Sequence, residues 1–242
     1  MIEITEIIRQ SEHGYTKPFL CRGDDGAEYY VKGALAGNES LVFEWLAGCL
    51  AREFGLPIPN FSIVYVPEYL VDSSLGDYSD LGAGYAFGSL SLSSLVEITR
   101  EYARKVPLNM QLDVLAFDWW VKNEDRKMGQ IYGNPNLFIN AKDGQLVVLD
   151  HNCAFDATFS YNSFRDEHVF SPNLPKLEDL VLRAKFCERF DKILDGWGGF
   201  CGSLPDDWLY PCGDPVEKQA NYIDVAYEIV SSYKSDEFWV MP

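Results

Sequence analysis

The sequence predicts an α+β protein with two lobes, in which a run of strands precedes a run of helices. Two observations support this class. Four short segments rich in β-branched and aromatic residues lie between residues 2 and 66, whereas apolar residues recur at helical spacing through most of the later chain. Separate runs of strands and helices are typical of the α+β class. With 242 residues, 47% of them hydrophobic, the chain can bury a sizeable core. We place the first lobe at residues 1–88 and the second at residues 89–242, together one domain.

The first lobe begins with three predicted strands. Their apolar segments are residues 2–8, 18–22 and 27–33, and a Gly-Asp-Asp-Gly turn joins the second to the third. Consecutive strands of this kind form an antiparallel meander. Lys32 then falls near the end of its third strand.

A helix and a fourth strand complete the first lobe. Asn38-Glu39-Ser40 can cap a helix, whose apolar residues recur at helical spacing until Gly55 and Pro57 stop it. Residues 61–66 are predicted to be another strand. Residues 71–94, rich in Ser, Gly, Asp and Tyr, show no clear period, so we predict the connection between the lobes there, with residues 85–89 as its ordered part.

The second lobe is predicted to be mainly helical. A helical stripe over residues 112–120 leads to the polar segment 123–126, and Asp118 within that helix is expected on a solvated polar face. Some twenty irregular residues are expected after Asp150. Two further helical patterns cover residues 177–190 and 216–230, the second with Asp214 as its cap.

A predicted hairpin between the first two of these helices has polar ends. Its strands are residues 137–140 and 146–149. A loop of three or five residues centred on Asp143 would place Asn136 opposite Asp150, with an amide oxygen and a carboxylate about 5 Å apart. Such a pair suits Mg²⁺, a hard cation that takes oxygen ligands. A two-residue turn would shift the register by one residue, and the alternative is an ordinary surface hairpin with polar ends.

Composition and charge exclude several classes of function. The net charge of -17 argues against a broad nucleic-acid footprint and against binding to an anionic membrane surface. No stretch approaches the ~18 apolar residues of a membrane span, and residues 1–6 do not resemble a signal peptide. The six cysteines form no C-x-x-C pair, so we expect reduced thiols, no structural zinc and a cytoplasmic protein.

The order of these features resembles that of a protein kinase: a loop, a strand lysine, a helix, a connector, a catalytic Asp, an Asn and an Asp at a hairpin end. The chain most closely resembles the HipA-like kinase family, in particular a short branch of it. The matching stretches are Asp24-Asp25-Gly26 leading to Tyr30-Val31-Lys32, Glu44 in the helix ending Gly55-Leu56-Pro57-Ile58-Pro59, residues 117–126, Asn134-Pro135-Asn136-Leu137 and Val148-Leu149-Asp150-His151-Asn152.

This resemblance implies a two-lobed protein-kinase-like fold, with an antiparallel sheet in the first lobe and mainly helices in the second. It also implies transfer of the γ-phosphoryl group of ATP to a serine or threonine of a protein, with ATP and Mg²⁺ as cofactors. The implied roles are as follows: Lys32 binds the α- and β-phosphates, Glu44 pairs with Lys32, Asp125 accepts the substrate proton, Asn136 and Asp150 bind Mg²⁺, and the loop containing Ser11, Gly14 and Thr16 covers the phosphates.

Alternatives remain open for several of these residues. Lys32 could be a solvated strand-end lysine, Glu44 could be solvated, and Asp125 and Arg126 could form a salt bridge at the end of a helix. The sequence also departs from the kinase pattern at two places. The phosphate loop has a single glycine, and ten residues separate Asp125 from Asn136 where the kinase pattern has four. Adjacency to the strand favours Asn136 as the metal ligand, whereas HipA-like spacing favours Asn134.

The resemblance leaves the partners partly open. The chain is shorter than the HipA toxins and no counterpart of their amino-terminal domain is found in it, so a toxin role and a DNA-binding antitoxin partner do not carry over. A protein substrate is the first expectation. Phosphorylation of a small molecule or lipid on the same fold, or a non-catalytic nucleotide-binding module, are the alternatives.

Overall fold

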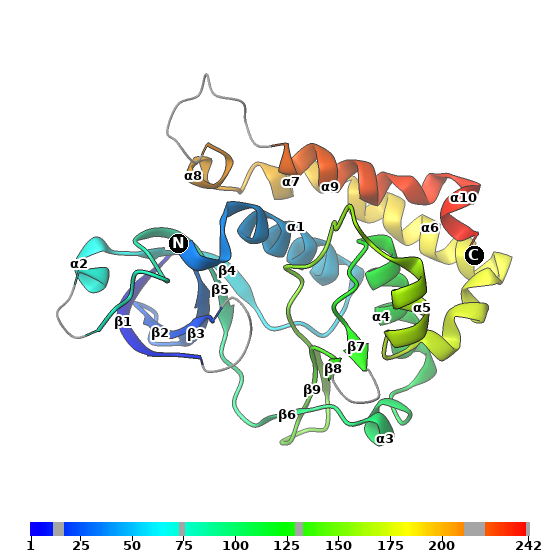
Figure 1. The fold of residues 1–242 in the computed structure, drawn as a ribbon, viewed down its shortest axis with the longest axis horizontal. Helices are drawn as coiled ribbons and strands as arrows, with labels where there is room; N and C mark the ends of the chain where they lie inside the picture. Colours follow the sequence, from blue (N-terminus) through cyan, green and yellow to red (C-terminus); the bar gives the residue numbers. More distant parts are fainter. Residues whose placement is uncertain (12–16, 73–75, 129–132, 211–220, 241–242) are drawn as a thin grey trace. The chain divides into compact units, whose positions relative to one another are not determined.

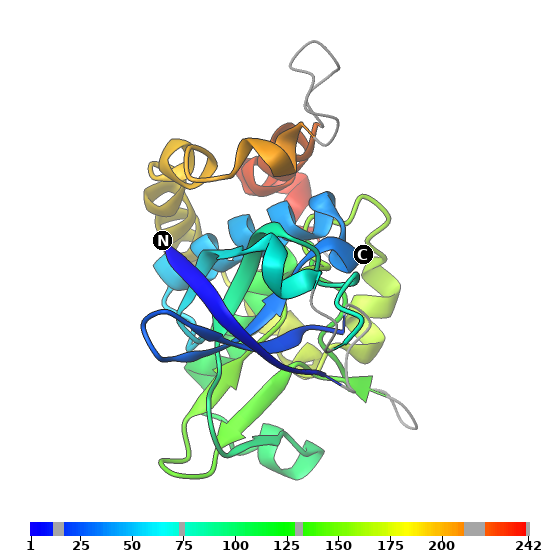
Figure 2. The same cartoon turned by 90° about the vertical axis from the view of Figure 1, so that its left-hand side faces the viewer.

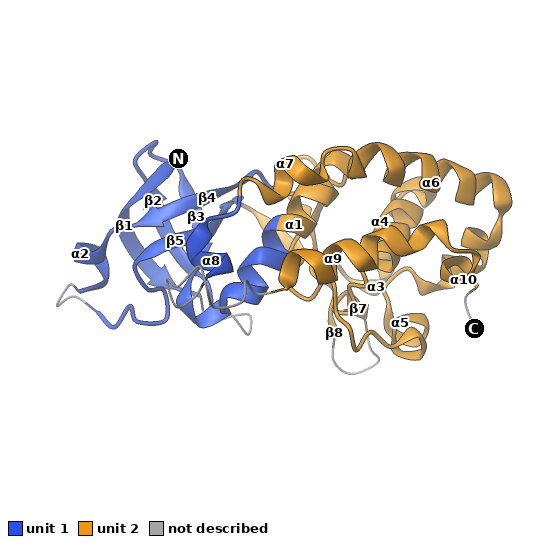
Figure 3. Cartoon of the chain, turned by 90° about the horizontal axis from the view of Figure 1, so that it is seen from above, with its two compact units in different colours: residues 1–45, 59–93, 204–220 blue, residues 46–58, 94–203, 221–242 orange. Residues whose placement is uncertain are grey.

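The computed structural model describes residues 1–11, 17–72, 76–128, 133–210 and 221–240. These residues form two compact units, which Figure 3 shows in two colours. Unit 1 comprises Met1–Trp45, Pro59–Ser93 and Leu204–Ala220, and unit 2 comprises Leu46–Ile58, Ser94–Ser203 and Asn221–Pro242. The units therefore alternate along the sequence, whereas the sequence predicted a single change of lobe after residue 88.

Strands predominate in unit 1 and helices in unit 2, which confirms the α+β class (Figure 1). Unit 1 contains β1 (Ile2–Gln10), β2 (Phe19–Gly23), β3 (Glu28–Lys32), β4 (Phe61–Val66), β5 (Gly84–Leu90), a 3-10 turn at Ala34–Ala36, α2 (Glu68–Val71) and α8 (Asp206–Leu209). Helix α1 (Asn38–Phe54) contributes residues to both units. Unit 2 contains β6 (Leu95–Glu97), α3 (Arg100–Ala103), α4 (Leu108–Trp120), β7 (Lys127–Met128), β8 (Gly133–Asn134), β9 (Leu137–Asn140), β10 (Leu146–Val148), α5 (Tyr161–Glu167), α6 (Leu180–Leu194), α7 (Trp197–Cys201), α9 (Tyr222–Ser231) and α10 (Asp236–Trp239), with 3-10 helices at Ser171–Glu178 and Ser232–Lys234.

The strands of unit 1 close into a five-stranded barrel (Figure 2). The order around the barrel is β1-β2-β3-β5-β4, and the predicted antiparallel meander of β1, β2 and β3 is confirmed. The sheet is not wholly antiparallel, because β1 and β4 close the barrel as a parallel pair at Ile2 and Val64. Full closure leaves no free strand edge, which lets a small sheet bury its inner face.

Strand β5 contains residues 85–89, the predicted ordered part of residues 71–94, but it belongs to the sheet of unit 1 and not to a connection between lobes. It pairs with both β3 and β4, so it lies inside the sheet. Its Gly and Ser residues obscured the period of a strand, yet Gly88 fits its place. A Cβ there would come within 2.6 Å of Val64 on the neighbouring strand, so only glycine fits without displacing the valine.

The core of unit 2 is built from aromatic side chains. Trp120 of α4 stacks on Phe190 of α6 at 4.1 Å between ring centroids, and its indole donates to the Val230 carbonyl of α9 at 2.8 Å. Phe54 also stacks on Phe190. Aromatic pairs of this kind add to the stabilisation from burial alone. The core therefore joins residues of four helices, α1, α4, α6 and α9.

Two other predictions for unit 2 need correction or fall outside the structure. The segment after Asp150 is not wholly irregular, because α5 forms there and is capped by Ser160, whose side chain accepts from the Ser163 amide. Helix α9 begins at Tyr222, and the predicted cap at Asp214 lies outside the described residues. Among the described residues, none of the helices combines the length and hydropathy needed to cross a membrane.

Candidate active site

Lys32 and Glu44 form a buried ion pair in unit 1. The lysine Nζ lies 2.8 Å from the Glu44 carboxylate, and the two side chains are only 11% and 6% exposed. Lys32 ends strand β3, as predicted, and Glu44 lies on α1. The alternatives in which either residue is solvated are therefore wrong. A buried pair of this kind holds an ammonium group in a defined place.

The backbone after Lys32 is held tightly. A Cβ on Gly33 would overlap the carbonyl oxygen of Leu81, and the same carbonyl accepts from the Ala34 amide at 2.8 Å. Glycine is therefore required where the strand that carries Lys32 leaves the barrel.

The predicted phosphate loop is described only at its ends. The Ser11 amide donates to the Pro18 carbonyl at 2.8 Å, which joins the two ends of the loop. Gly14 and Thr16 lie outside the described residues. Their proposed contact with phosphate stays a prediction.

The register of the β9–β10 hairpin differs by one residue from the prediction. The Asn140 amide donates to the Gln145 carbonyl at 2.9 Å across a four-residue loop, and the Asn140 carbonyl accepts from the Gly144 amide at 2.8 Å. Leu149 rather than Asp150 then lies opposite Asn136, and its amide donates to the Asn136 carbonyl at 2.9 Å. The loop has this length because the Asn140 side chain accepts from the Lys142 amide and Gly144 adopts a positive φ of 72°.

Despite this difference in register, two predicted metal ligands, Asn134 and Asn136, lie beside Asp125 in unit 2. The amide groups of Asn134 and Asn136 both donate to its Oδ2, at 3.0 and 3.1 Å. Among the described residues of the segment between Asp125 and Asn136, Lys127 of β7 pairs with Asn134 of β8 and Met128 with Gly133. This pairing brings Asn134 back to the Asp125 carboxylate.

The negative charge of Asp150 acts on Asp125. Burial and then the charge of Asp150 raise the pKa of Asp125, and the hydrogen bonds from Asn136 and Asn134 only partly offset this. Two carboxylates that repel each other beside amide groups make a site that favours a cation.

A buried polar network lies directly behind Asp125, and the sequence did not predict it. Asp118 and Arg126 are both 0% exposed, and Arg126 Nε donates to Asp118 at 2.6 Å. The prediction of a solvated Asp118 is wrong, and so is a salt bridge between Asp125 and Arg126, because the guanidinium faces Asp118. One signal was present in the sequence. Asp118 lies among Phe117, Trp119 and Trp120, and a helix that is apolar all round is buried.

The electrostatics of this network favour an ionised Asp118 and a neutral His168. Burial alone would raise the pKa of Asp118, but the charge of Arg126 and the hydrogen bond from His168 outweigh it and hold the pKa well below its usual range. Burial lowers the pKa of His168, and the hydrogen bond to Asp118 only partly offsets this effect. His168 Nδ1 accepts from the Phe170 amide at 3.1 Å, which leaves the proton on Nε2 for Asp118.

The donor set of this site fits Mg²⁺ better than a transition metal. Among the described residues there is no cluster of three or more His, Cys, Asp and Glu side chains that could hold a metal ion. Asp150 and Asn136 supply one carboxylate and one amide oxygen, with Asn134 as a second amide beside them. Mg²⁺ is commonly bound through one or two carboxylates, with water and substrate phosphates filling its shell.

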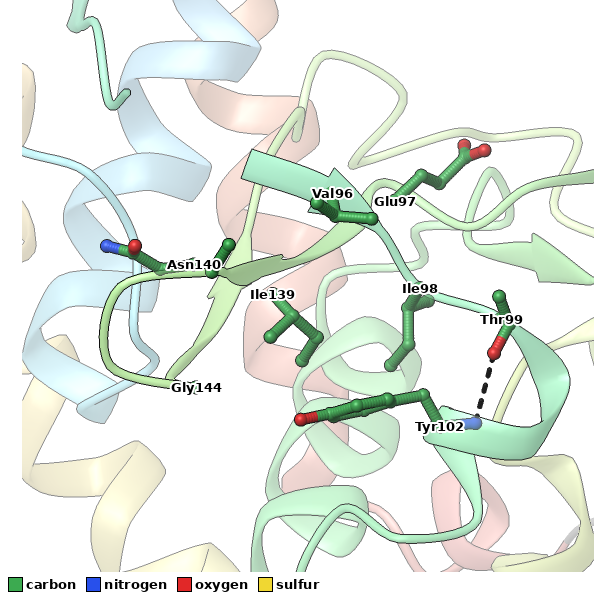
Figure 4. Close-up of a pocket in the computed structure, with 9 residues that line it drawn as sticks. Val96, Glu97, Ile98, Thr99, Tyr102, Ile139, Asn140 and Gly144 are labelled. Carbon is green, nitrogen blue, oxygen red and sulfur yellow. Dashed lines mark hydrogen bonds between the residues drawn. The ribbon is translucent and has the colours of Figure 1, made fainter. Parts of the chain in front are cut away.

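An apolar pocket lies elsewhere in unit 2, between β6, α3 and the β9–β10 hairpin (Figure 4). Its volume is about 310 Å³, and the side chains of Ile98, Tyr102 and Ile139 point toward one another in it. None of the predicted site residues lines this pocket. It is therefore separate from the carboxylate site.

Comparisons with known proteins identify a family for nearly the whole chain. A family model described as HipA-like kinase matches residues 4–242. Among solved structures, the chain is similar to the crystal structure of the Helicobacter pylori proinflammatory kinase CtkA, with 10% sequence identity and a TM-score of 0.49, over 97% of this chain and 94% of that chain. The search of curated proteins gave no match.

Proposed function

Because the chain belongs to the HipA-like kinase family, we propose that it transfers the γ-phosphoryl group of ATP, in a reaction that needs Mg²⁺, to a serine or threonine hydroxyl of a protein. The observation that best supports this is the group formed by Asp125, Asn134, Asn136 and Asp150. The same segments carry the residues that protein kinases use for the acceptor hydroxyl and the metal. A cytoplasmic location, where ATP is abundant and thiols stay reduced, is part of the proposal.

In this proposal Asp125 accepts the proton of the acceptor hydroxyl. Its pKa is raised by burial and by Asp150, which brings it closer to the range in which a carboxylate is an effective general base. The two amide hydrogen bonds to Oδ2 fix the orientation of the carboxylate, so that Oδ1 is the oxygen left to face the hydroxyl. Orientation of this kind lowers the entropic part of the barrier.

Lys32 would bind the α- and β-phosphates of ATP. Glu44 holds its ammonium group at 2.8 Å, which limits the side-chain entropy lost when a phosphate binds. Asn136 and Asp150 would hold Mg²⁺, which when bound neutralises the charge on the β- and γ-phosphates. Ser11 and the loop that follows it would cover the phosphates.

The acceptor can be identified by labelling. Purified protein, γ-labelled ATP and Mg²⁺ are incubated with heat-treated cell extract, and the products are separated into protein, lipid and small-molecule fractions. The Asp125→Asn variant measures the background, and chelation of Mg²⁺ should abolish the signal. Label on serine or threonine of a protein supports the proposal. Label only in lipid or metabolite overturns the protein acceptor, and absence of any ATP consumption overturns phosphotransfer itself in favour of a nucleotide-binding module.

A further inference from the structure

Arg126 forms hydrogen bonds to Asp118 and to the backbone beside both predicted metal ligands, Asn136 and Asp150. Its guanidinium binds Asp118 with two hydrogen bonds, from Nε at 2.6 Å and from Nη2 at 3.3 Å. The remaining nitrogen, Nη1, donates to three backbone carbonyls, those of Asn136 at 3.0 Å, Leu149 at 3.2 Å and Pro135 at 3.4 Å. The side chain is 0% exposed, so water cannot replace these partners.

These carbonyls flank the two predicted metal ligands. Asn136 and Asp150 both have positive φ, 48° and 56°, a left-handed conformation that costs free energy for residues other than glycine. The peptide planes on both sides of Asn136 carry two of the bonded carbonyls, and the plane before Asp150 carries the third. Arg126 therefore restrains the backbone just before strand β9 begins and just after strand β10 ends.

Arg126 is itself held from behind. Asp118 accepts from Asn123 Nδ2 at 2.9 Å and from His168 Nε2 at 3.0 Å, in addition to the guanidinium. The Arg126 carbonyl accepts from the Val169 amide at 3.1 Å. The guanidinium is thus fixed to helix α4 and to the segment after α5, both of which are parts of the packed unit.

We propose that Arg126 is a positioning residue that holds Asn136 and Asp150 in their left-handed conformations and so sets the place of the metal ligands beside Asp125. For its role in catalysis this inference depends on the proposed function. An arginine is required because its planar group presents five donors in a fixed fork, two for the carboxylate and others for the carbonyls. A lysine can keep the charge pair with Asp118, but it cannot reproduce this pattern.

The test compares Arg126→Lys with Arg189→Lys. Arg189 is a matched control in the same unit, because its side chain donates to the Asp113 carboxylate and the Phe54 carbonyl, neither of which belongs to the proposed metal site. Two quantities are measured: the hydrogen-exchange rate of the Leu149 amide by NMR, and the Mg²⁺ concentration that gives half-maximal ATP turnover.

In Arg126→Lys we expect the hydrogen-exchange rate of the Leu149 amide to rise at least tenfold, and the Mg²⁺ concentration for half-maximal turnover to rise at least tenfold. The amides of β1 to β5 and of α6 should keep their protection from exchange. Arg189→Lys should stay within threefold of the wild type in both. If Arg126→Lys does not fold, the double variant Asp118→Asn with Arg126→Gln removes both buried charges together and should give the same local losses.

Unchanged exchange at Leu149 and an unchanged Mg²⁺ requirement in a folded variant overturn the inference, because the lysine would then have replaced the arginine fully. If the wild type consumes no ATP, the proposed function fails, and the exchange rate alone still decides whether Arg126 holds the two turns.

Discussion

Asn136 and Asp150 hold the backbone in a conformation that most side chains avoid. Their φ angles of 48° and 56° are left-handed, and Asn and Asp tolerate that region better than other residues with a side chain. The one-residue difference in register does not separate them from Asp125, because a left-handed residue redirects the chain at the end of each strand. The strand pattern in the sequence could not show this turn, since period-two alternation carries no information on φ.

Replacement of Asn136 and of Asn134 should have unequal effects. Asn136 is buried and Asn134 is exposed, although both donate to Asp125. We expect Asn136→Ala to cause the larger loss of turnover and a higher Mg²⁺ requirement. Asn136→Gly, which adopts a φ of 48° without strain, should lose as much, and this would separate the lost amide from backbone strain. A larger loss for Asn134→Ala would identify Asn134 as the metal ligand instead.

His168 should make stability depend on pH. Its folded pKa is lowered by burial, whereas in the unfolded chain it titrates near pH 6.5. Below that pH the unfolded chain binds a proton that the folded protein excludes, so the free energy of unfolding should fall as the pH drops from about 7 to about 5, by at most about 1.4 kcal/mol per pH unit.

Urea denaturation at several pH values measures this slope. His168→Gln, whose amide can still donate to Asp118, removes the titrating group and should flatten the dependence between these pH values. An equal slope in both proteins would mean that other groups cause it.

At the scale of elements, the backbone that follows strand β3 requires a glycine at position 33. In Gly33→Ala the new methyl group meets a backbone carbonyl that cannot rotate away, so we expect a loss of about 1 to 3 kcal/mol in the free energy of unfolding. Gly199→Ala in α7 is the control, because a Cβ there has no atom within 4 Å. It should stabilise the helix by up to about 1 kcal/mol. Equal effects of the two changes in thermal denaturation would contradict the close contact at Leu81.

Variants of the buried Lys32–Glu44 pair can distinguish an effect on stability from an effect on nucleotide binding. Lys32→Met leaves the Glu44 carboxylate buried without its ammonium partner, and we expect a loss of about 3 to 5 kcal/mol. Lys32→Met with Glu44→Leu should recover most of that stability but not the affinity for ATP, measured by calorimetry in Mg²⁺. The effect on affinity should be larger at low salt, where the acidic field is less screened. Unchanged ATP affinity in both variants would exclude Lys32 from phosphate binding.

Sequence patterns predicted the elements whose period is regular and missed those whose role is set by neighbours. The meander β1 to β3 and helix α4 follow clear periods of two and of about 3.6 residues. The glycine at position 88 of strand β5 is explained by the close approach of Val64, and only the packed barrel shows this contact. The place of Arg126 likewise depends on the Asp118 carboxylate and on three carbonyls from two separate segments, which no local pattern encodes.

At the scale of the whole molecule, the net negative charge opposes the binding of an anionic nucleotide, whereas the proposed site would favour it. A net charge of -17 repels a nucleotide, whereas in the proposed function Lys32 in unit 1 and a metal ion held in unit 2 would attract it locally. The overall charge could be computed from the sequence, and so could the order of the motifs. The partner of each charge could not, because Arg126 pairs with the buried Asp118 rather than with Asp125, whose pKa is raised by burial and by the charge of Asp150.

The central claim is that Asp150 belongs to a centre for Mg²⁺-dependent phosphoryl transfer. The most direct test measures ATP turnover in Mg²⁺ for the wild type and Asp150→Ala, with circular dichroism to confirm folding. Asp143→Ala, an exposed carboxylate in the loop of the same hairpin, is the control. We predict that Asp150→Ala loses essentially all turnover while the control stays within tenfold of the wild type. Turnover of folded Asp150→Ala within about tenfold of the wild type, or ~1.4 kcal/mol of barrier, would contradict the claim.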